Sequence, residues 1–306
     1  MQQIYDTVVV GTGAAGLTAG LYLSRAKLNA LLLEKETIGG ELMNRDLIEN
    51  YPGYSDGIIG SELGSNMMVQ VMNYEGEIQL AEVSEIKLGQ DYKEVKTAQG
   101  DYLSRTVIIA GGAHPKKLGI AGEEEFSDKG VFYCATCDGP HFAGKVVAVA
   151  GGGDSGITEG LHLTQYVSKV IVIEIMPELN ATKILQERAS ANPKIEIRCG
   201  TKIEAILGDT EVKELSLADV KTGESYKLEV DGILVHIGLD PNTDYLKGTV
   251  PLDSKGQILV NAKMETEIPG IFAAGDIRSN SPMQVSTAVG DGATAALSAQ
   301  RYLKGL

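Results

Sequence analysis

Apolar residues occur in short runs that alternate with segments of helical spacing. The apolar run Thr7–Val10 leads into a glycine-rich turn, a helical pattern and a second apolar run that ends at Glu34. The same order returns when Val146–Ala150 is followed by a turn, a helical pattern and a run that ends at Glu174. Short buried strands that alternate with helices are typical of a parallel sheet in an α/β protein. The pattern therefore predicts two strand–helix–strand units in one chain.

The glycine-rich turns read GTGAAG from Gly11 to Gly16 and GGGDSG from Gly151 to Gly156. In such a turn the first glycine permits the tight bend, the second lets backbone N–H groups approach a pyrophosphate, and the third allows close packing of helix on strand. The helix N-terminus favours negative phosphates. In both copies an acid follows eighteen positions after the last glycine, where it can accept hydrogen bonds from a ribose. Two such copies predict a flavin site and a nicotinamide site.

These motifs supply the candidate nucleotide contacts. Those of the first copy are Gly11, Gly13, Ala14, Ala15, Gly16, Glu34 and Lys35, and those of the second are Gly151, Gly153, Asp154, Ser155, Gly156 and Glu174.

Cys134 and Cys137 are separated by two residues in VFYCATCDGP, and Asp138 directly follows the second thiol. Two cysteines at this spacing can close on each other, as a redox dithiol does. A zinc site and an inert structural bridge are the alternatives. Zinc would need two more ligands, and the four histidines show no paired spacing. We therefore expect no metal, and we interpret the third cysteine, Cys199, as a small core residue.

Near the C-terminus, GIFAAGDI (Gly270–Ile277) has the pattern of a buried strand that ends in a Gly-Asp turn, and an Ala-rich helix follows. An acid in such a turn, here Asp276, is suited to hold the polyol of a flavin, although it can also be an ordinary capping residue. The helix N-terminus can face the electron-rich edge of a reduced flavin. The segment predicts that the chain returns to its first domain.

Composition narrows the class of protein. The 306 residues suffice for two domains, and an apolar fraction of 43% is normal for a globular core. A net charge of -14 without any block of Lys or Arg argues against nucleic acid as a partner. No apolar run approaches the roughly 18 residues of a membrane span, and the first residues lack the features of a signal peptide. With three cysteines only, we expect a cytoplasmic protein.

With both turns, CATCDG and GIFAAGD, the sequence resembles the low-molecular-weight thioredoxin reductases and the similar C-terminal part of alkyl hydroperoxide reductase flavoproteins. GGEL (Gly39–Leu42) and IENYPG (Ile48–Gly53) also match that family. The resemblance implies an α/β protein of two Rossmann-like, three-layer domains. An FAD domain would comprise residues 1–113 and 241–306, with a nicotinamide-type domain, residues 114–240, inserted. Further implied FAD contacts are Gly40, Glu41, Leu42, Asn50, Gly275, Asp276, Gln284 and Val285.

The same resemblance implies roles for the redox residues. Cys137 would exchange electrons with FAD, Cys134 would form a mixed disulfide with thioredoxin, and Asp138 would move protons. A thiolate, not a thiol, attacks a disulfide, and a flavin converts a two-electron donor into thiol reduction. The family also implies a homodimer.

The sequence departs from the NADPH-dependent members at the residues that bind the electron donor. Those members carry a His-Arg-Arg run and a further Arg, which bind the 2′-phosphate. Here Glu174, Ile175 and Met176 replace the run, and Asn180 replaces the last Arg. A carboxylate accepts from a free ribose 2′-OH and opposes a phosphate, so NADH is the favoured donor. Relatives that lost the nicotinamide site and use ferredoxin also lack these arginines, and NADPH is the third alternative.

The sequence thus predicts an FAD-dependent thioredoxin-disulfide reductase. Two other functions remain open, namely a flavoprotein that donates electrons to a peroxide-reducing redoxin system and a dithiol sensor that binds FAD without turnover.

Overall fold

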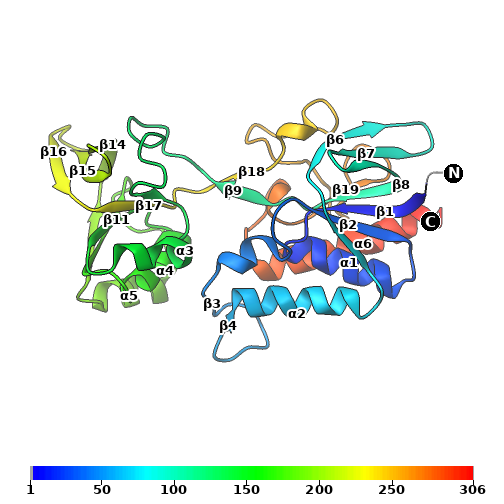
Figure 1. Cartoon of the computed structure of the whole chain (residues 1–306), viewed down its shortest axis with the longest axis horizontal. Helices are drawn as coiled ribbons and strands as arrows, with labels where there is room; N and C mark the ends of the chain where they lie inside the picture. Colours follow the sequence, from blue (N-terminus) through cyan, green and yellow to red (C-terminus); the bar gives the residue numbers. More distant parts are fainter. Residues whose placement is uncertain (1–2, 306) are drawn as a thin grey trace. The chain divides into compact units, whose positions relative to one another are not determined.

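The computed structural model describes residues 3–305, which divide into two compact units (Figure 1). Of the described residues, unit 1 comprises 3–114 and 240–305, and unit 2 comprises Pro115–Leu239. The chain passes between them through the strands β9 (Ala113–Pro115) and β18 (Leu239–Pro241), which pair with each other. Unit 2 is therefore an insertion into unit 1.

Unit 1 contains a sheet of strand order β5-β2-β1-β8-β7-β6, in which β19 pairs with the end of β8. The central strands are parallel and rich in Val, Leu and Ile, whereas β6 and β7 form an antiparallel hairpin. Because β19 comes from near the C-terminus, this sheet unites both ends of the chain. The strands are β1 (Ile4–Val10), β2 (Ala30–Glu34), β5 (Glu77–Leu80), β6 (Val83–Leu88), β7 (Lys93–Thr97), β8 (Gly100–Ile109) and β19 (Ile271–Ala273).

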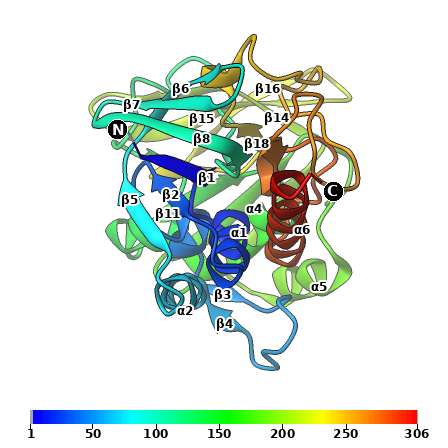
Figure 2. The same cartoon turned by 90° about the vertical axis from the view of Figure 1, so that its right-hand side faces the viewer.

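Three helices lie on one face of this sheet, as Figures 1 and 2 show. They are α1 (Ala14–Arg25), α2 (Gly60–Met72) and α6 (Val285–Leu303). The short elements of unit 1 are η1 (Gly40–Asn44), β3 (Leu47–Ile48), β4 (Ile58–Ile59), η3 (Asp244–Leu246) and η4 (Gly275–Ile277).

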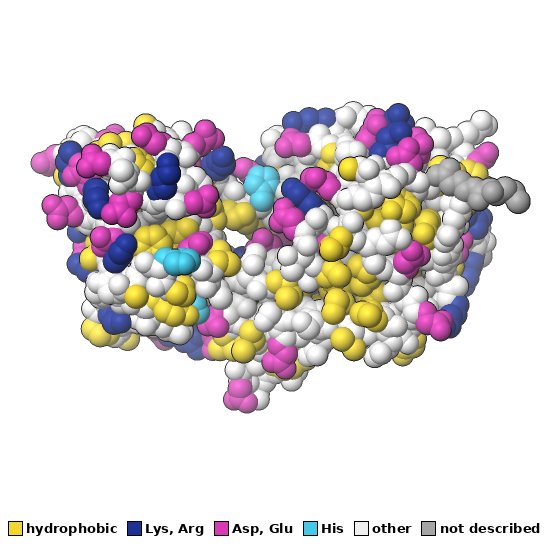
Figure 3. All heavy atoms as spheres, viewed as in Figure 1, with side chains coloured by type: hydrophobic (Ala, Val, Ile, Leu, Met, Phe, Trp, Pro, Cys, Tyr) yellow, Lys and Arg dark blue, Asp and Glu magenta, His cyan; other side chains and the backbone are white. Residues whose placement is uncertain are grey.

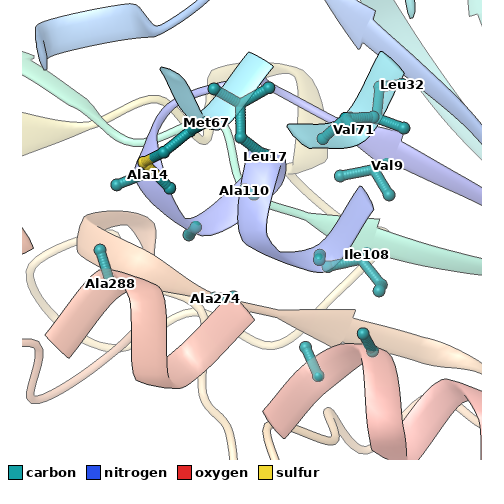
Figure 4. Packing of buried hydrophobic residues seen from close by; sticks show 14 of the residues in the cluster. Val9, Ala14, Leu17, Leu32, Met67, Val71, Ile108, Ala110, Ala274 and Ala288 are labelled. Carbon is teal, nitrogen blue, oxygen red and sulfur yellow. The ribbon is translucent and has the colours of Figure 1, made fainter. Parts of the chain in front are cut away.

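The core of unit 1 has two layers because successive residues of a strand point to opposite faces. Val9 packs toward the helices, in one buried cluster with Leu17 of α1 and Ile108 of β8 (Figure 4). Val8 and Val10 belong to a second cluster, which includes residues of β6 and β7. The two clusters bury both faces of the parallel strands.

Unit 2 has a parallel sheet of order β10-β17-β11-β12-β13 and a separate antiparallel sheet β14-β15-β16. One buried cluster joins the parallel sheet to α4 and α5, and another joins it to the antiparallel sheet. Both units are thus layered α/β structures, which confirms the predicted fold class. The elements are β10 (Val131–Phe132), α3 (Ala135–Asp138), η2 (Gly139–Phe142), β11 (Val146–Ala150), α4 (Asp154–Leu163), β12 (Lys169–Glu174), α5 (Lys183–Ala191), β13 (Ile195–Cys199), β14 (Thr201–Gly208), β15 (Val212–Asp219), β16 (Ser225–Glu229) and β17 (Gly232–Val235).

The surface carries charged side chains of both signs. On the face seen in Figure 3, Lys and Arg alternate with Asp and Glu over each unit. Among residues 3–305, no helix combines the length and apolarity that crossing a membrane requires.

Candidate active site and nucleotide turns

The first glycine-rich turn joins β1 to α1 and requires glycine at two positions. Gly11 has φ +97°, and a Cβ there would lie 2.4 Å from the carbonyl oxygen of Ala110. A Cβ on Gly16 would lie 1.9 Å from the carbonyl oxygen of Gly11. Gly13 differs, with φ -66° and no atom within 4 Å of its Cβ position. Because no side chain caps α1, its N-terminal N–H groups remain available for an anion beside Gly13.

Glycines from two other segments approach this helix N-terminus. A Cβ on Gly40, at the start of η1, would lie 3.2 Å from Cα of Gly13. One on Gly275, at the start of η4, would lie 3.0 Å from Cβ of Ala15. Three segments thus present backbone without side chains at one place, as a pyrophosphate requires. The residues present therefore fit a dinucleotide such as FAD.

Glu34, at the end of β2, closes the first turn. Its Oε2 accepts the backbone N–H of Thr12 at 2.8 Å and the hydroxyl of Thr12 at 2.7 Å, and its Oε1 accepts the N–H of Glu36 at 3.1 Å. Carboxylate oxygens have lone pairs beyond these bonds, so Glu34 can also accept from a ribose. Lys35 points to carboxylates instead, since its Nζ lies 3.4 Å from Glu36 and 3.3 Å from Glu82.

The second glycine-rich turn joins β11 to α4 and repeats the geometry of the first. Gly151 has φ +109°, and its Cβ would lie 2.1 Å from the carbonyl oxygen of His236. A Cβ on Gly156 would lie 2.1 Å from the carbonyl oxygen of Gly151. Gly153 has φ -85° and open space at its Cβ position. Asp154 and Ser155 form the first turn of α4 beside it.

Glu174, at the end of β12, closes this second turn. It is 8% exposed, its Oε2 accepts the N–H of Gly152 at 2.6 Å, and its Oε1 accepts the N–H of Met176 at 2.8 Å. The following loop folds back onto the turn, because the N–H groups of Asn180 and Ala181 both donate to the carbonyl of Gly152 at 3.1 Å. Glu34 and Glu174 therefore hold their turns in the same way.

Cys134 and Cys137 form a disulfide in unit 2, which confirms that the two sulfurs lie within bonding reach. Cys134 is the N-cap of α3, and its Sγ accepts the backbone N–H of Cys137 at 3.1 Å. Asp138 ends the same short helix. Burial raises the pKa of Asp138, while nearby His141 lowers it and Asp128 raises it.

Cys199, the third cysteine, ends β13 beside Glu174 in the sheet register. It is partly buried, and burial, with Glu174 and Glu178, raises the pKa of its thiol. Within residues 3–305, no group of three or more His, Cys, Asp or Glu side chains is arranged to hold a metal ion.

The remaining predicted flavin contacts lie at η1, η4 and the start of α6. Asp276 is in η4, where burial raises its pKa and the Ser281 hydroxyl donates to its Oδ1 at 3.2 Å. The side-chain amide of Asn50 donates to Oε1 of Gln284 at 2.9 Å, so these two residues lie together. Of the others, Glu41 pairs with Arg45 at 3.7 Å, Leu42 is buried in the core cluster, and Val285 begins α6.

A buried ion pair, which no spacing pattern in the sequence indicated, holds η4 against α6. Nε of Arg278 donates to Oδ2 of Asp291 at 2.7 Å, and the same oxygen accepts the N–H of Gly275 at 3.1 Å. The two side chains are only 13% and 9% exposed. A charged residue in the middle of an Ala-rich helix was the only available signal.

Known proteins resemble the whole chain. Residues 5–292 match the family model described as pyridine nucleotide-disulphide oxidoreductase. The thioredoxin reductase of Bacillus subtilis (strain 168) is 40% identical over 306 residues, which cover 100% of this chain and 96% of that protein. The crystal structure of Lactococcus lactis thioredoxin reductase has a TM-score of 0.97 at 39% identity, covering 99% of this chain and 100% of that one. A ferredoxin-flavin thioredoxin reductase from Clostridium acetobutylicum has a TM-score of 0.55 at 30% identity, with 100% of both chains covered.

Proposed function

We propose that this chain, which belongs to the thioredoxin reductase family of the pyridine nucleotide-disulphide oxidoreductases, carries electrons from NADH to a thioredoxin-like protein. It is a flavin oxidoreductase that acts on a disulfide. The observation that carries the proposal is the Cys134–Cys137 disulfide, in one chain with two dinucleotide turns. The homodimer that the resemblance implies stays a prediction.

FAD is the cofactor that membership of this family implies. When bound, it supplies the exchange between a two-electron donor and a dithiol. The N-terminus of α1, with Gly13 and Gly40, would hold the pyrophosphate. Glu34 would accept from the ribose, and Asp276 would hold the polyol.

The two cysteines divide the reduction of the partner between them. As a thiolate, Cys134 attacks the disulfide of the thioredoxin, forming a mixed disulfide and releasing one thiolate of the partner. Cys137 then attacks Sγ of Cys134, which restores the internal disulfide and releases the reduced partner. The N–H of Cys137 donates to Sγ of Cys134 and stabilises negative charge on it. Because its pKa is raised, the Asp138 carboxyl holds a proton more readily and can supply it to a departing thiolate.

The surroundings of Glu174 support NADH as the donor. A ribose 2′-OH can donate to the carboxylate, whereas a 2′-phosphate would be repelled by it. The next two side chains, Ile175 and Met176, are 53% and 56% exposed and carry no charge. No Lys or Arg occurs between Ile175 and Thr182, so this loop offers no cation to a phosphate.

A ferredoxin-type donor is the second candidate. The similarity to a ferredoxin-flavin thioredoxin reductase favours it. The absence of arginines after Glu174 is compatible with both candidates.

Anaerobic reduction of the bound flavin, followed by its visible absorbance, separates the donors. We expect NADH to bleach the flavin at least about 100-fold faster than NADPH at equal concentration, because a buried carboxylate opposes the phosphate. The variant Met176→Arg is the matched control, since it adds one cation next to Glu174 and should narrow the difference. Bleaching by reduced ferredoxin, with neither nucleotide effective, would overturn the proposal for NADH.

A further inference from the structure

Glu123 is a buried carboxylate of unit 2 that the mechanism above does not use. It is 2% exposed. Its Oε1 accepts the N–H of Leu118 at 2.7 Å and the phenolic O–H of Tyr133 at 2.9 Å, and its Oε2 accepts the N–H of Gly119 at 2.6 Å. Three short bonds to a charged acceptor are strong and compensate for the loss of water around it. Glu123 is therefore a fixed point in the fold.

Tyr133, the third of these donors, directly precedes Cys134. Its ring packs against the buried cluster that contains Phe126 and Val131. Burial is the main cause that raises the pKa of Tyr133, and the hydrogen bond to Glu123 raises it further. The phenol therefore keeps its proton at the pH of catalysis and continues to donate. The chain is thus anchored one residue before the thiol that attacks the partner.

We propose that Glu123, acting through Tyr133, fixes the chain ahead of Cys134 and so sets the effective concentration of the Cys137 thiol at Cys134. Both are positioning residues, because neither contacts the partner's disulfide in this mechanism. The inference rests on the proposed disulfide-reductase function and deepens it.

Two steps of the thiol chemistry depend on the position of Cys134. Closing the internal disulfide joins the two sulfurs and passes two electrons and two protons to an oxidant, which is oxidised dithiothreitol in the measurement below and the partner's disulfide in turnover. The equilibrium of this step depends on how often one sulfur meets the other. In turnover, the Cys137 thiolate forms a bond to Sγ of Cys134, the mixed disulfide breaks, and the partner's thiolate leaves with the electron pair. Freeing Tyr133 spreads Cys134 over more positions, so it should weaken the first equilibrium and slow the second step.

Tyr133→Phe is the sharpest variant because it removes only the phenolic oxygen. Glu123→Gln is the second variant, since it also loosens Leu118 and Gly119 but keeps the shape of the side chain. The matched control is Tyr5→Phe, because the Tyr5 hydroxyl also donates to a carboxylate, that of Glu77, at 3.4 Å, and lies in unit 1.

The primary measurement is the midpoint potential of the Cys134–Cys137 couple in the FAD-loaded enzyme. The enzyme is equilibrated with dithiothreitol buffers at fixed pH, and its free thiols are then trapped by alkylation. For Tyr133→Phe we expect about a fivefold loss of effective concentration, as for one lost hydrogen bond. This corresponds to a potential about 20 mV less negative. Glu123→Gln should shift it in the same direction, and Tyr5→Phe should leave it unchanged.

A single-turnover experiment supplies the second readout. Reduced enzyme mixed with oxidised thioredoxin should accumulate the mixed disulfide in Tyr133→Phe, with decay about fivefold slower than in the unmodified enzyme. Unchanged potential and unchanged decay in both Tyr133→Phe and Glu123→Gln would overturn the proposal, as would an equal shift in Tyr5→Phe. The potential measurement uses neither thioredoxin nor a nicotinamide. It therefore still tests the anchor if the physiological partner or donor proves to be different.

Discussion

The two glycine-rich turns have one internal geometry but different surroundings. Around the turn of unit 1, η1 and η4 bring Gly40 and Gly275 to within 3.2 Å and 3.0 Å of the start of α1, measured from their Cβ positions. The turn of unit 2 instead receives a single loop, through the hydrogen bonds of Asn180 and Ala181 to Gly152. A site assembled from several segments suits a resident cofactor, whereas a site closed by one loop suits a ligand that exchanges.

The second position of each turn shows the same contrast in detail. In unit 1 this position is Thr12, whose hydroxyl gives Glu34 an additional hydrogen bond. In unit 2 it is Gly152, where a Cβ would lie 2.6 Å from Cδ2 of Leu179. The space of a side chain is thus filled by the loop that follows β12. The two turns therefore share their glycine positions, and they differ in the segments that pack against them.

The largest effect that tests this contrast is expected from Gly13→Asp. The backbone at Gly13 accepts any L-residue, and no atom lies within 4 Å of its Cβ position, so the fold should persist. The new carboxylate would stand where we propose that the pyrophosphate binds, and like charges in contact cost several kcal/mol. We expect FAD affinity to fall at least about 1000-fold in titrations of the apoprotein. Gly13→Ala is the control for bulk. A Gly13→Asp enzyme that purifies with full FAD would contradict the assignment of this turn.

Gly153→Asp is the matched change in unit 2. It should leave the FAD content unaltered. The rate of flavin bleaching at low NADH concentration should fall about 1000-fold, because the new carboxylate would repel the pyrophosphate of NADH. Reduction by dithionite should be unaffected, and Gly153→Ala should behave nearly as the unmodified enzyme. NADH reduction at the unmodified rate in Gly153→Asp would show that the second turn does not bind the donor.

Asp138→Asn should have a smaller effect, confined to the thiol chemistry of unit 2. Because burial raises the pKa of Asp138 above the ordinary 3.8, its acid form survives to higher pH and is lost as pH rises through the raised value. We expect the rate of thioredoxin reduction to fall on the order of 100-fold in the variant. The limb of the rate–pH profile that reflects ionisation of this carboxyl should also disappear. FAD content should not change. Retention of that limb in steady-state rates of Asp138→Asn would assign it to another group.

The same raised pKa affects stability with a defined sign. The folded state binds the Asp138 proton more tightly than the unfolded state, so this residue favours folding at low pH. That contribution is lost as pH rises through the raised pKa. Between the pKa of Asp138 in the unfolded state and its raised pKa in the folded state, the free energy of unfolding should decline with pH. In Asp138→Asn it should decline less than in the unmodified protein, as urea titrations at several pH values would show.

Local patterns in the sequence predicted the parts of the structure that depend on neighbours in the chain. The strand, turn and helix around Gly11 and the repeat around Gly151 follow from residue type and spacing, so both turns were predictable. The Arg278–Asp291 pair and the Glu123–Tyr133 bond were not. Each joins charged or polar residues that have no repeating spacing, and their burial arises only when separate elements pack together.

The pairing of β9 with β18 has a consequence for the evolution of the protein. Because the two ends of unit 2 lie next to each other, a gene segment for such a unit can enter a loop of a host domain, or be exchanged for another, without separating the strands of the host. Unit 2, which carries the second glycine-rich turn, can thus be replaced or altered in evolution while the sheet of unit 1, built from both ends of the chain, is kept.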